Sequence, residues 1–287
     1  MSRSPPQPDS RQFGLEFGQI LGRHFLGTED LHFGLWPADL PVCWGNVSAA
    51  QAHHSQMILD HIPEGVRSIL DVGGGAGHFA RKLRDCGYAV DMVSPSAHLR
   101  TRARELLGPE STVIVSRLEE LQTDQRYDLV LFSESFQYIP VAQALSCAEG
   151  LLADEGKLLI LDDFRRKVPG RPPVGGGHRW EQWELGLANS PFEMLHEVGV
   201  TALAAPMCQL FGELMDEVGV PLRDLVVDYG TTQRPFVAKI LGWLFRRKID
   251  KVNRRHFSGR INRDAFIEQI IYKLMLLQPT ITSSKNS

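Results

Sequence analysis

The sequence contains little cysteine and no long apolar run. Its four cysteines lie far apart and form no C-x-x-C pair, which argues against a zinc site and against a disulfide framework. Free thiols are typical of a cytoplasmic protein, and this is the location we expect. No stretch of about 18 apolar residues occurs, and the opening residues MSRSPPQPDS lack the apolar segment of a signal peptide. Neither a membrane span nor secretion is therefore predicted.

The chain also lacks a large excess of charge of either sign. Its formal net charge is −3, whereas a general nucleic-acid binder usually carries a strongly basic balance. We therefore expect no nucleic-acid partner and no membrane partner, and nothing in the sequence bears on the oligomeric state. With 287 residues, the chain is long enough for one large domain with additions or for two small ones.

Short apolar strands alternate with helical segments through the first part of the chain. The predicted strands are VRSILDV (66–72), YAVDMV (88–93), TVIVS (112–116), YDLVLF (127–132) and KLLILDD (157–163). This alternation indicates a parallel sheet covered on both faces. Ahead of it we expect a helix at 11–26, an ordered loop, and a helix that Ser48 and Gln51 begin with a capping box. Beyond it we expect a helix at 206–219, a sixth strand at 222–230, a long helix at 234–257, and a short helix leading into a last strand within 265–279.

A glycine-rich loop follows the first of these strands. The run ILDVGGGAGHFA (69–80) places Asp71 and a G-x-G-x-G pattern between a strand and a helix. Glycines permit a tight turn and close backbone approach, and the N-terminus of a helix offers free N–H groups to an anion. Three glycines also occur in loops for packing reasons alone. The strand before the loop and the helix after it favour the nucleotide-binding interpretation.

The loop resembles motif I of the class I S-adenosylmethionine-dependent methyltransferases, since dinucleotide sites have G-x-G-x-x-G instead. The similarity covers residues 48–165 clearly and 201–278 loosely. It implies a Rossmann-like α/β fold, with a doubly wound, mostly parallel seven-stranded sheet, helices on both faces, an N-terminal helical lid and helical inserts. It also implies S-adenosyl-L-methionine as the cofactor and S-adenosyl-L-homocysteine as the product.

The resemblance divides the chain into eight segments. These are a disordered tail (1–10), an N-terminal helix and lid (11–47), the cofactor-binding core (48–165), an insert (166–200), the continued core (201–234), a basic helical insert (235–261), the last helix and strand (262–278) and a second tail (279–287).

Several residues would bind the cofactor if the family pattern holds. The glycines of the loop would line its methionine and ribose end, Asp71 would order the loop or the ammonium group, and Ser133 would lie near the sulfonium. Residues after the third strand would contact adenine. The implied contacts are Asp71, Gly73, Gly74, Gly75, Gly77, Ser94, Leu118, Glu119 and Ser133.

Ser94 departs from the family pattern. It lies seventeen residues after Gly77, where the family usually has an acid that accepts hydrogen bonds from both ribose hydroxyls. Ser94 either contacts the ribose or caps the following helix while another group holds the ribose. Asp91 is a poor substitute, because strand alternation sends it to the other face. A fold that has lost catalysis is a bolder alternative, although the glycine loop is intact.

Candidates for the acceptor site lie in three segments. In DLHFGLW, which resembles the HYGYW-type lid segment of small-molecule methyltransferases, His32 is a candidate base, and Phe33 and Trp36 are candidate substrate contacts. Alternatively, the aromatic residues of this segment pack in the core, and His32 bonds only to the backbone. After the fourth strand, Glu134 and Tyr138 are candidates for positioning or deprotonating the acceptor, or else for capping and packing. His178 is a further candidate from the Pro- and Gly-rich insert.

Two further groups of charged or titratable residues stand out in the sequence. His53, His54 and His61 share a helix, but with no carboxylate or thiol partner in sequence we expect no metal site. The run RRKIDKVNRRHFSGR (246–260) is either a solvated helix face or a binding site for an anionic acceptor. The sequence thus predicts a methyltransferase for O-, N- or C-methylation of a small molecule. The alternatives are an inactive cofactor-binding or partner protein, and a methyltransferase for macromolecules.

Overall fold

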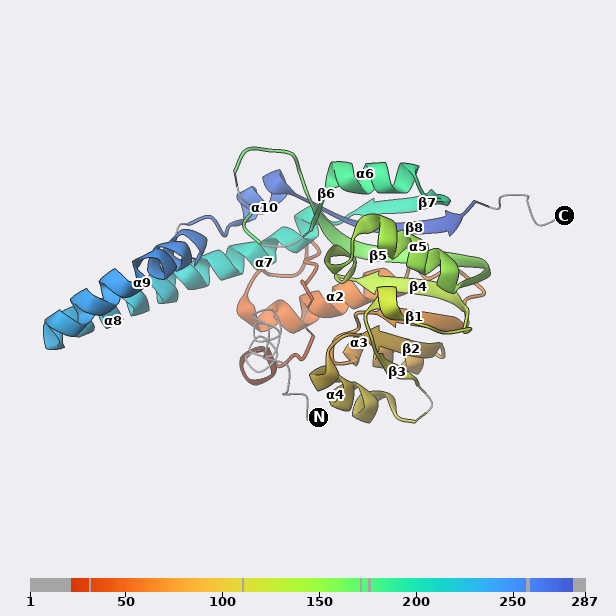
Figure 1. Ribbon diagram of the computed structural model, residues 1–287, viewed down its shortest axis with the longest axis horizontal. Coiled ribbons are helices and arrows are strands. Elements are labelled where there is room, and N and C mark those ends of the chain that lie inside the picture. The colour runs from red at the N-terminus through yellow and green to blue at the C-terminus, as the bar shows by residue number, and fades with distance from the viewer. Residues whose placement is uncertain are drawn as a thin grey trace, which may run out of the picture.

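The computed structural model describes residues 22–280, apart from residues 31, 110, 171, 175, 176, 257 and 258. One mixed sheet runs through the body, and helices cover both of its faces (Figure 1). Most of the predicted leading helix and of both tails lies outside the described residues. Only the π-helical turn Gly22–Leu26 of that first segment is described.

The sheet has eight strands in the described part of the chain. They are β1 (Ser68–Val72), β2 (Ala89–Ser94), β3 (Val113–Val115), β4 (Tyr127–Ser133), β5 (Leu152–Arg165), β6 (His178–Arg179), β7 (Phe192–Gly199) and β8 (Ile270–Pro279). The order is β3-β2-β1-β4-β5-β8-β7, and the short β6 pairs with the end of β5. Strands β1 to β5 are parallel, and β8 runs antiparallel to β5 and β7. The predicted doubly wound, mostly parallel sheet is confirmed, with β6 added to the seven strands expected.

The helices are α2 (Val47–Leu59), α3 (His78–Asp85), α4 (Ala97–Leu107), α5 (Val141–Leu151), α6 (Trp180–Ala188), α7 (Thr201–Leu214), α8 (Val220–Gln233), α9 (Pro235–His256) and α10 (Arg263–Gln269). Successive residues of the central strands enter two different apolar layers. Leu131 and Leu159 pack in one layer, whereas Phe132 and Ile160 pack in the other. Because both faces of the sheet are buried, these strands read as continuous apolar runs.

The sixth strand was predicted in the wrong place. Residues 222–230 lie in α8, and the strand that pairs with the outer side of β8 is β7, inside the segment predicted as an insert. Apolar residues in α8 recur at helical spacing, whereas β7 carries polar side chains because it is an edge strand with much of its surface exposed. Because Glu193, His196 and Glu197 interrupt its apolar residues, β7 has no continuous apolar run from which a strand could be predicted.

Helices α8 and α9 form an arm that extends away from the body, at the left of Figure 1. The long helix predicted in this region is confirmed as α9. Apolar side chains on the arm are exposed, among them Leu225, Phe236 and Trp243. No described helix is long and apolar enough to cross a lipid bilayer.

The predicted capping box at Ser48 and Gln51 is wrong. Helix α2 begins at Val47, and no side chain caps its first turn. Gln51 is buried and bonds to the preceding loop instead: it accepts from the hydroxyl of Thr28 at 2.7 Å, and its amide donates to the carbonyls of Asp30 and His32 at 3.0 and 2.8 Å. Gln51 thereby holds the loop before α2 against that helix, next to the site described below.

Candidate active site

The glycine loop connects β1 to α3 at the carboxyl edge of the parallel strands. Gly75 has a φ of 55°, in the region that favours glycine, and a Cβ there would meet no protein atom. Gly73 lies against the backbone and side chain of Ser135, whose hydroxyl donates to the carbonyl of Val72. The loop therefore faces open space at Gly75 and is packed against the segment after β4 at Gly73.

Glu134 is the central residue of a buried polar cluster beside this loop. It follows β4 directly and has a φ of 53°, a backbone conformation that is uncommon for non-glycine residues and is concentrated at functional sites. Its Oε1 accepts hydrogen bonds from the backbone N–H of Phe33, at 2.7 Å, and from the hydroxyl of Tyr272. Three distant parts of the chain, the loop before α2, the end of β4 and strand β8, thus meet at one carboxylate.

Two histidines complete the cluster. His54 Nε2 lies 3.1 Å from the Tyr272 hydroxyl and 3.6 Å from Glu134 Oε1. When Glu134 is ionised, the tyrosine proton goes to the carboxylate, so His54 Nε2 must donate to the tyrosine oxygen. The ring of His32 stacks on that of His54, with centroids 4.1 Å apart.

His32 is held as a neutral imidazole with one free nitrogen. Its Nδ1 lies 2.9 Å from the carbonyl of Phe33, and a carbonyl only accepts, so Nδ1 carries the proton. Nε2 then bears a lone pair; it has no hydrogen-bond partner among the described residues, and Asp30 Oδ2 lies 3.8 Å from it. Burial lowers the pKa of His32, and it lowers the pKa of His54 well below its usual value.

Carboxylates around the cluster have raised pKa values. Burial raises the pKa of Glu134 to about 7, although the bonds from Tyr272 and the Phe33 N–H act in the opposite direction. At the end of β5, burial raises the pKa of Asp163 to about 6 and that of Asp162 well above its usual range. Gln137 donates to both of these aspartates, at 3.1 and 3.3 Å. Groups with strongly perturbed pKa values in one place are typical of an active site.

A family model described as a methyltransferase domain matches residues 49–204, which is more than half of the chain. This chain belongs to the class I S-adenosylmethionine-dependent methyltransferases. The malonyl-[acyl-carrier protein] O-methyltransferase 1 of Ilyobacter polytropus is 28% identical over 131 residues, which are 44% of this chain and 49% of that protein. The chain spans about half the length of the curated relatives it matches.

Several solved structures have the same fold as this methyltransferase and align with nearly all of its chain. A geranyl diphosphate C-methyltransferase from Streptomyces coelicolor A3(2), in complex with S-adenosyl-L-homocysteine, has a TM-score of 0.64 at 15% identity, over 96% of this chain and 100% of its own. A cyclopropane synthase from Mycobacterium tuberculosis has a TM-score of 0.64 at 15% identity, over 92% of this chain and 95% of its own. At such low identity these likenesses establish the fold alone.

The residues of the loop fit the cofactor of this class. At Gly75 there is open space beside the backbone, and a side chain at this position would occupy it. Asp71 is buried, and its Oδ2 has no hydrogen-bond partner within the described part of the chain, so this oxygen is available to a donor. Burial raises the pKa of Asp71 to about 7. The assignment of Gly73, Gly74, Gly75, Gly77, Leu118, Glu119 and Ser133 as cofactor contacts stays a prediction.

Ser94 ends β2 and is buried, and its hydroxyl accepts from the backbone N–H of Ser96 at 3.4 Å. This bond is the one expected if Ser94 caps the turn into α4. Asp91 is not available for a ribose, because its two oxygens accept from the N–H of Thr112, at 2.8 Å, and the hydroxyl of Tyr127, at 3.0 Å. A ribose contact of Ser94 stays a prediction.

Three of the predicted acceptor residues lie in different surroundings. Phe33 lies in the cluster, where its ring is edge-on to Tyr272 with centroids 6.4 Å apart. Trp36 is buried in an apolar group with Val47 and Met207, as the packing alternative expects. Tyr138, by contrast, is 56% exposed.

The last candidate for the acceptor site is His178. His178 is half-buried beside the turn after β4, with Nε2 2.8 Å from the carbonyl of Ile139. Among the described residues, no group of three or more His, Cys, Asp or Glu side chains has the arrangement of a metal site.

Sequence reasoning missed two residues of the cluster, His54 and Tyr272, and three residues beside it, Gln137, Asp162 and Asp163. His54 was considered only as a metal ligand, and Asp162 only as the end of a strand. That strand end was itself a usable signal, since functional groups gather at the carboxyl ends of parallel strands. Tyr272 carried no signal, because β8 runs antiparallel and approaches Glu134 only in the folded chain.

Titration of Asp71 should make the apoprotein less stable as pH rises. Its folded pKa of about 7 lies above the usual 3.8, so the folded state binds more protons than the unfolded state between about pH 4 and 7. The free energy of unfolding then falls with pH, by at most about 1.4 kcal/mol per pH unit for one group. Asp71→Asn should make this fall shallower.

Urea denaturation at pH 5, 6 and 7 would measure the effect in both proteins. Asp124→Asn, which removes an exposed carboxylate, serves as the control and should follow the wild type. An Asp71→Asn protein with the wild-type pH dependence would contradict the interpretation.

Proposed function

We propose that this protein transfers the methyl group of S-adenosyl-L-methionine to a small-molecule acceptor. The observation that carries the proposal is the position of Glu134. Its carboxylate is buried beside the glycine loop, because the next residue, Ser135, packs directly against Gly73. A group that can take up a proton is thus adjacent to the loop assigned to the cofactor.

Glu134 is suited to act as the base. One of its oxygens is occupied by the Phe33 N–H and Tyr272, and its side chain is 16% exposed, so the other oxygen is the one available to an acceptor. With a pKa of about 7, a large fraction is ionised at neutral pH, and proton uptake is favourable. Tyr272 and His54 orient the carboxylate, and His32 offers a second lone pair at Nε2.

The bound cofactor supplies an electrophilic methyl group, and the residues of this chain align the acceptor with it and exclude water. Asp71 and the loop glycines would hold the methionine and ribose end, and Leu118 and Glu119 would lie toward the adenine. The acceptor loses a proton when oxygen, nitrogen or carbon is methylated, and Glu134 is placed to receive it.

The polar cluster around Glu134 is covered by a loop of the protein, and this favours a small acceptor. The loop before α2 is tied down by Gln51 and supplies the N–H of Phe33 to Glu134, so it covers the site from one side. The geranyl diphosphate C-methyltransferase with the same fold also acts on a small molecule. A cytoplasmic location and the absence of a nucleic-acid partner stay predictions from the sequence.

Titration calorimetry with S-adenosyl-L-methionine and S-adenosyl-L-homocysteine tests the proposal. We expect both to bind, because the glycine loop and Asp71 are intact. The absence of binding of either at millimolar concentration would favour the alternative of a protein that has kept the fold and lost the cofactor. Specific methylation of protein or nucleic acid, with no transfer to small molecules, would favour the third alternative.

A further inference from the structure

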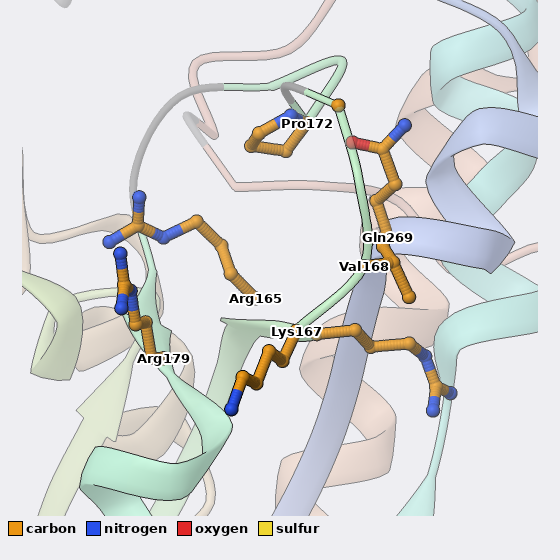
Figure 2. Close-up of a pocket in the computed structure, with 8 residues that line it drawn as sticks. Arg165, Lys167, Val168, Pro172, Arg179 and Gln269 are labelled. Carbon is orange, nitrogen blue, oxygen red and sulfur yellow. The ribbon is translucent and has the colours of Figure 1, made fainter.

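A basic pocket lies at the carboxyl end of β5, outside the buried cluster (Figure 2). Its volume is about 200 Å³, well above the roughly 10–15 Å³ that a cavity needs for one water molecule. Arg165, Arg166, Lys167 and Arg179 contribute to its lining, together with Gln269 at the end of α10. No acidic residue lines the pocket among the described residues.

Two arginines of the pocket are direct neighbours in the sheet. Arg165 of β5 and Arg179 of β6 are paired in register, and Figure 2 shows their guanidinium groups close together. Since like charges at short range repel, this pairing raises the free energy of the empty pocket. An anion between the two groups would remove that cost.

The pocket has little internal compensation for its charge. The segment RRKVPGRPPVGGGHR (165–179) contains no Asp or Glu, and Arg179 and Lys167 form no ion pair in the part of the chain that the structure describes. Arg165 does interact with Asp163, and its Nε donates to the carbonyl of Gly177 at 2.9 Å. That bond fixes the direction of the side chain and leaves its two terminal nitrogens for a ligand.

Several arginines with a lysine are the side chains that recognise phosphate groups. A guanidinium presents paired N–H donors that match two oxygens of a phosphate, and an ammonium adds a compact charge. Arg166 is likewise directed by the chain, because its Nε donates to the carbonyl of Ile270 at 3.3 Å. The donors thus come from residues that β5, β6 and β8 position.

Gly177 links this pocket to the candidate active site. Its carbonyl accepts from Arg165, and its N–H donates to Gln137 Oε1 at 3.1 Å. Gln137 in turn donates to Asp162 and Asp163, beside the cluster that contains Glu134. The pocket and Glu134 thus lie at the same carboxyl edge of the parallel strands, joined by a chain of hydrogen bonds.

The geometry points to a binding site for a phosphate or diphosphate group carried by the methyl acceptor. That the ligand is the acceptor rests on the proposed function; that the pocket binds the anion does not. For the basic run at 246–260, the sequence left open a solvated helix face or a binding site for such an anion. Arg246 and Arg247 of this run lie exposed on α9 in the arm.

Calorimetric titration of the full chain with inorganic pyrophosphate and inorganic phosphate, at constant ionic strength, tests the site. The double variant Arg165→Gln/Arg179→Gln should weaken binding of the tighter anion by about tenfold or more. The matched control is Arg246→Gln/Arg247→Gln, which removes the same charge from the arm and should bind as the wild type does. Circular dichroism melting of all three proteins checks that they fold.

The two titrations distinguish a diphosphate site, a monophosphate site and the absence of an anion site. Preferential binding of pyrophosphate assigns a diphosphate, and equal or better binding of phosphate assigns a monophosphate. Failure of both anions to bind, or equal losses in the two double variants, would overturn the proposal. Titration with S-adenosyl-L-homocysteine in the same samples separates the two proposals, because the pocket variant should retain that binding. Anion binding without cofactor binding would leave the pocket in place and overturn the proposed function.

Discussion

Replacing Gly75 with valine should eliminate binding of S-adenosyl-L-homocysteine. Gly75 has a φ of 55°, and a Cβ there would enter space that no protein atom occupies. In the assigned loop this space belongs to the cofactor, so a branched side chain would block it at close range. We expect the affinity to fall by about a hundredfold or more, equivalent to roughly 2.8 kcal/mol, as measured by titration calorimetry.

Gly65 offers a matched control for this variant. It also has a positive φ, of 84°, and a Cβ there would also meet no protein atom, but it lies in the turn before β1. Valine at either position should cost about 1–2 kcal/mol of stability through backbone strain. Gly65→Val should therefore bind the cofactor normally. Near-normal affinity in Gly75→Val would contradict the assignment of the loop.

Replacing Glu134 with glutamine should abolish most methyl transfer while making the protein more stable at alkaline pH. Loss of a general base typically lowers turnover by about 10² to 10⁴-fold. The folded pKa of about 7 exceeds the usual 4.5, so the ionised carboxylate is disfavoured by burial above pH 7. Glutamine keeps an oxygen for Tyr272 and carries no charge, and we expect the melting temperature at pH 8 to rise by a few degrees.

Two further variants sharpen this test. Glu120→Gln removes an exposed carboxylate and should change neither turnover nor melting temperature. Tyr272→Phe removes a hydrogen bond that lowers the pKa of Glu134, so the acid limb of the pH–rate profile should move to higher pH. Turnover is followed as release of S-adenosyl-L-homocysteine with any acceptor that the wild type methylates. Full activity in Glu134→Gln would exclude it as the base.

The sequence predicted what depends on neighbours along the chain. The five parallel strands and the position of the glycine loop between a strand and a helix were correct, because each of these strands has a continuous apolar run and the turn at Gly75 favours glycine. The strand β7 was missed because Glu193, His196 and Glu197 interrupt its apolar residues, as an exposed edge strand permits. The helical period of α8 was read as a strand, since its apolar residues are not buried against the body.

The candidate site was only partly predictable, for a related reason. Glu134 was identified from its position after β4, where functional groups collect. Its partners Tyr272 and His54 are brought to it by tertiary structure, and no local pattern distinguishes them from ordinary packing residues. The pairing of Arg165 with Arg179 likewise depends on β6, a strand of two residues that no periodicity can reveal.

The distance in sequence between Glu134 and Tyr272 has a consequence for how the protein is made. The bond between them joins residues 138 positions apart. At roughly 5–20 residues per second of synthesis, Tyr272 is added about 7 to 28 seconds after Glu134. The glycine loop and the strands β1 to β5 are all synthesised before then. On the ribosome, the part of the chain assigned to the cofactor is therefore complete before the carboxylate acquires the tyrosine that orients it.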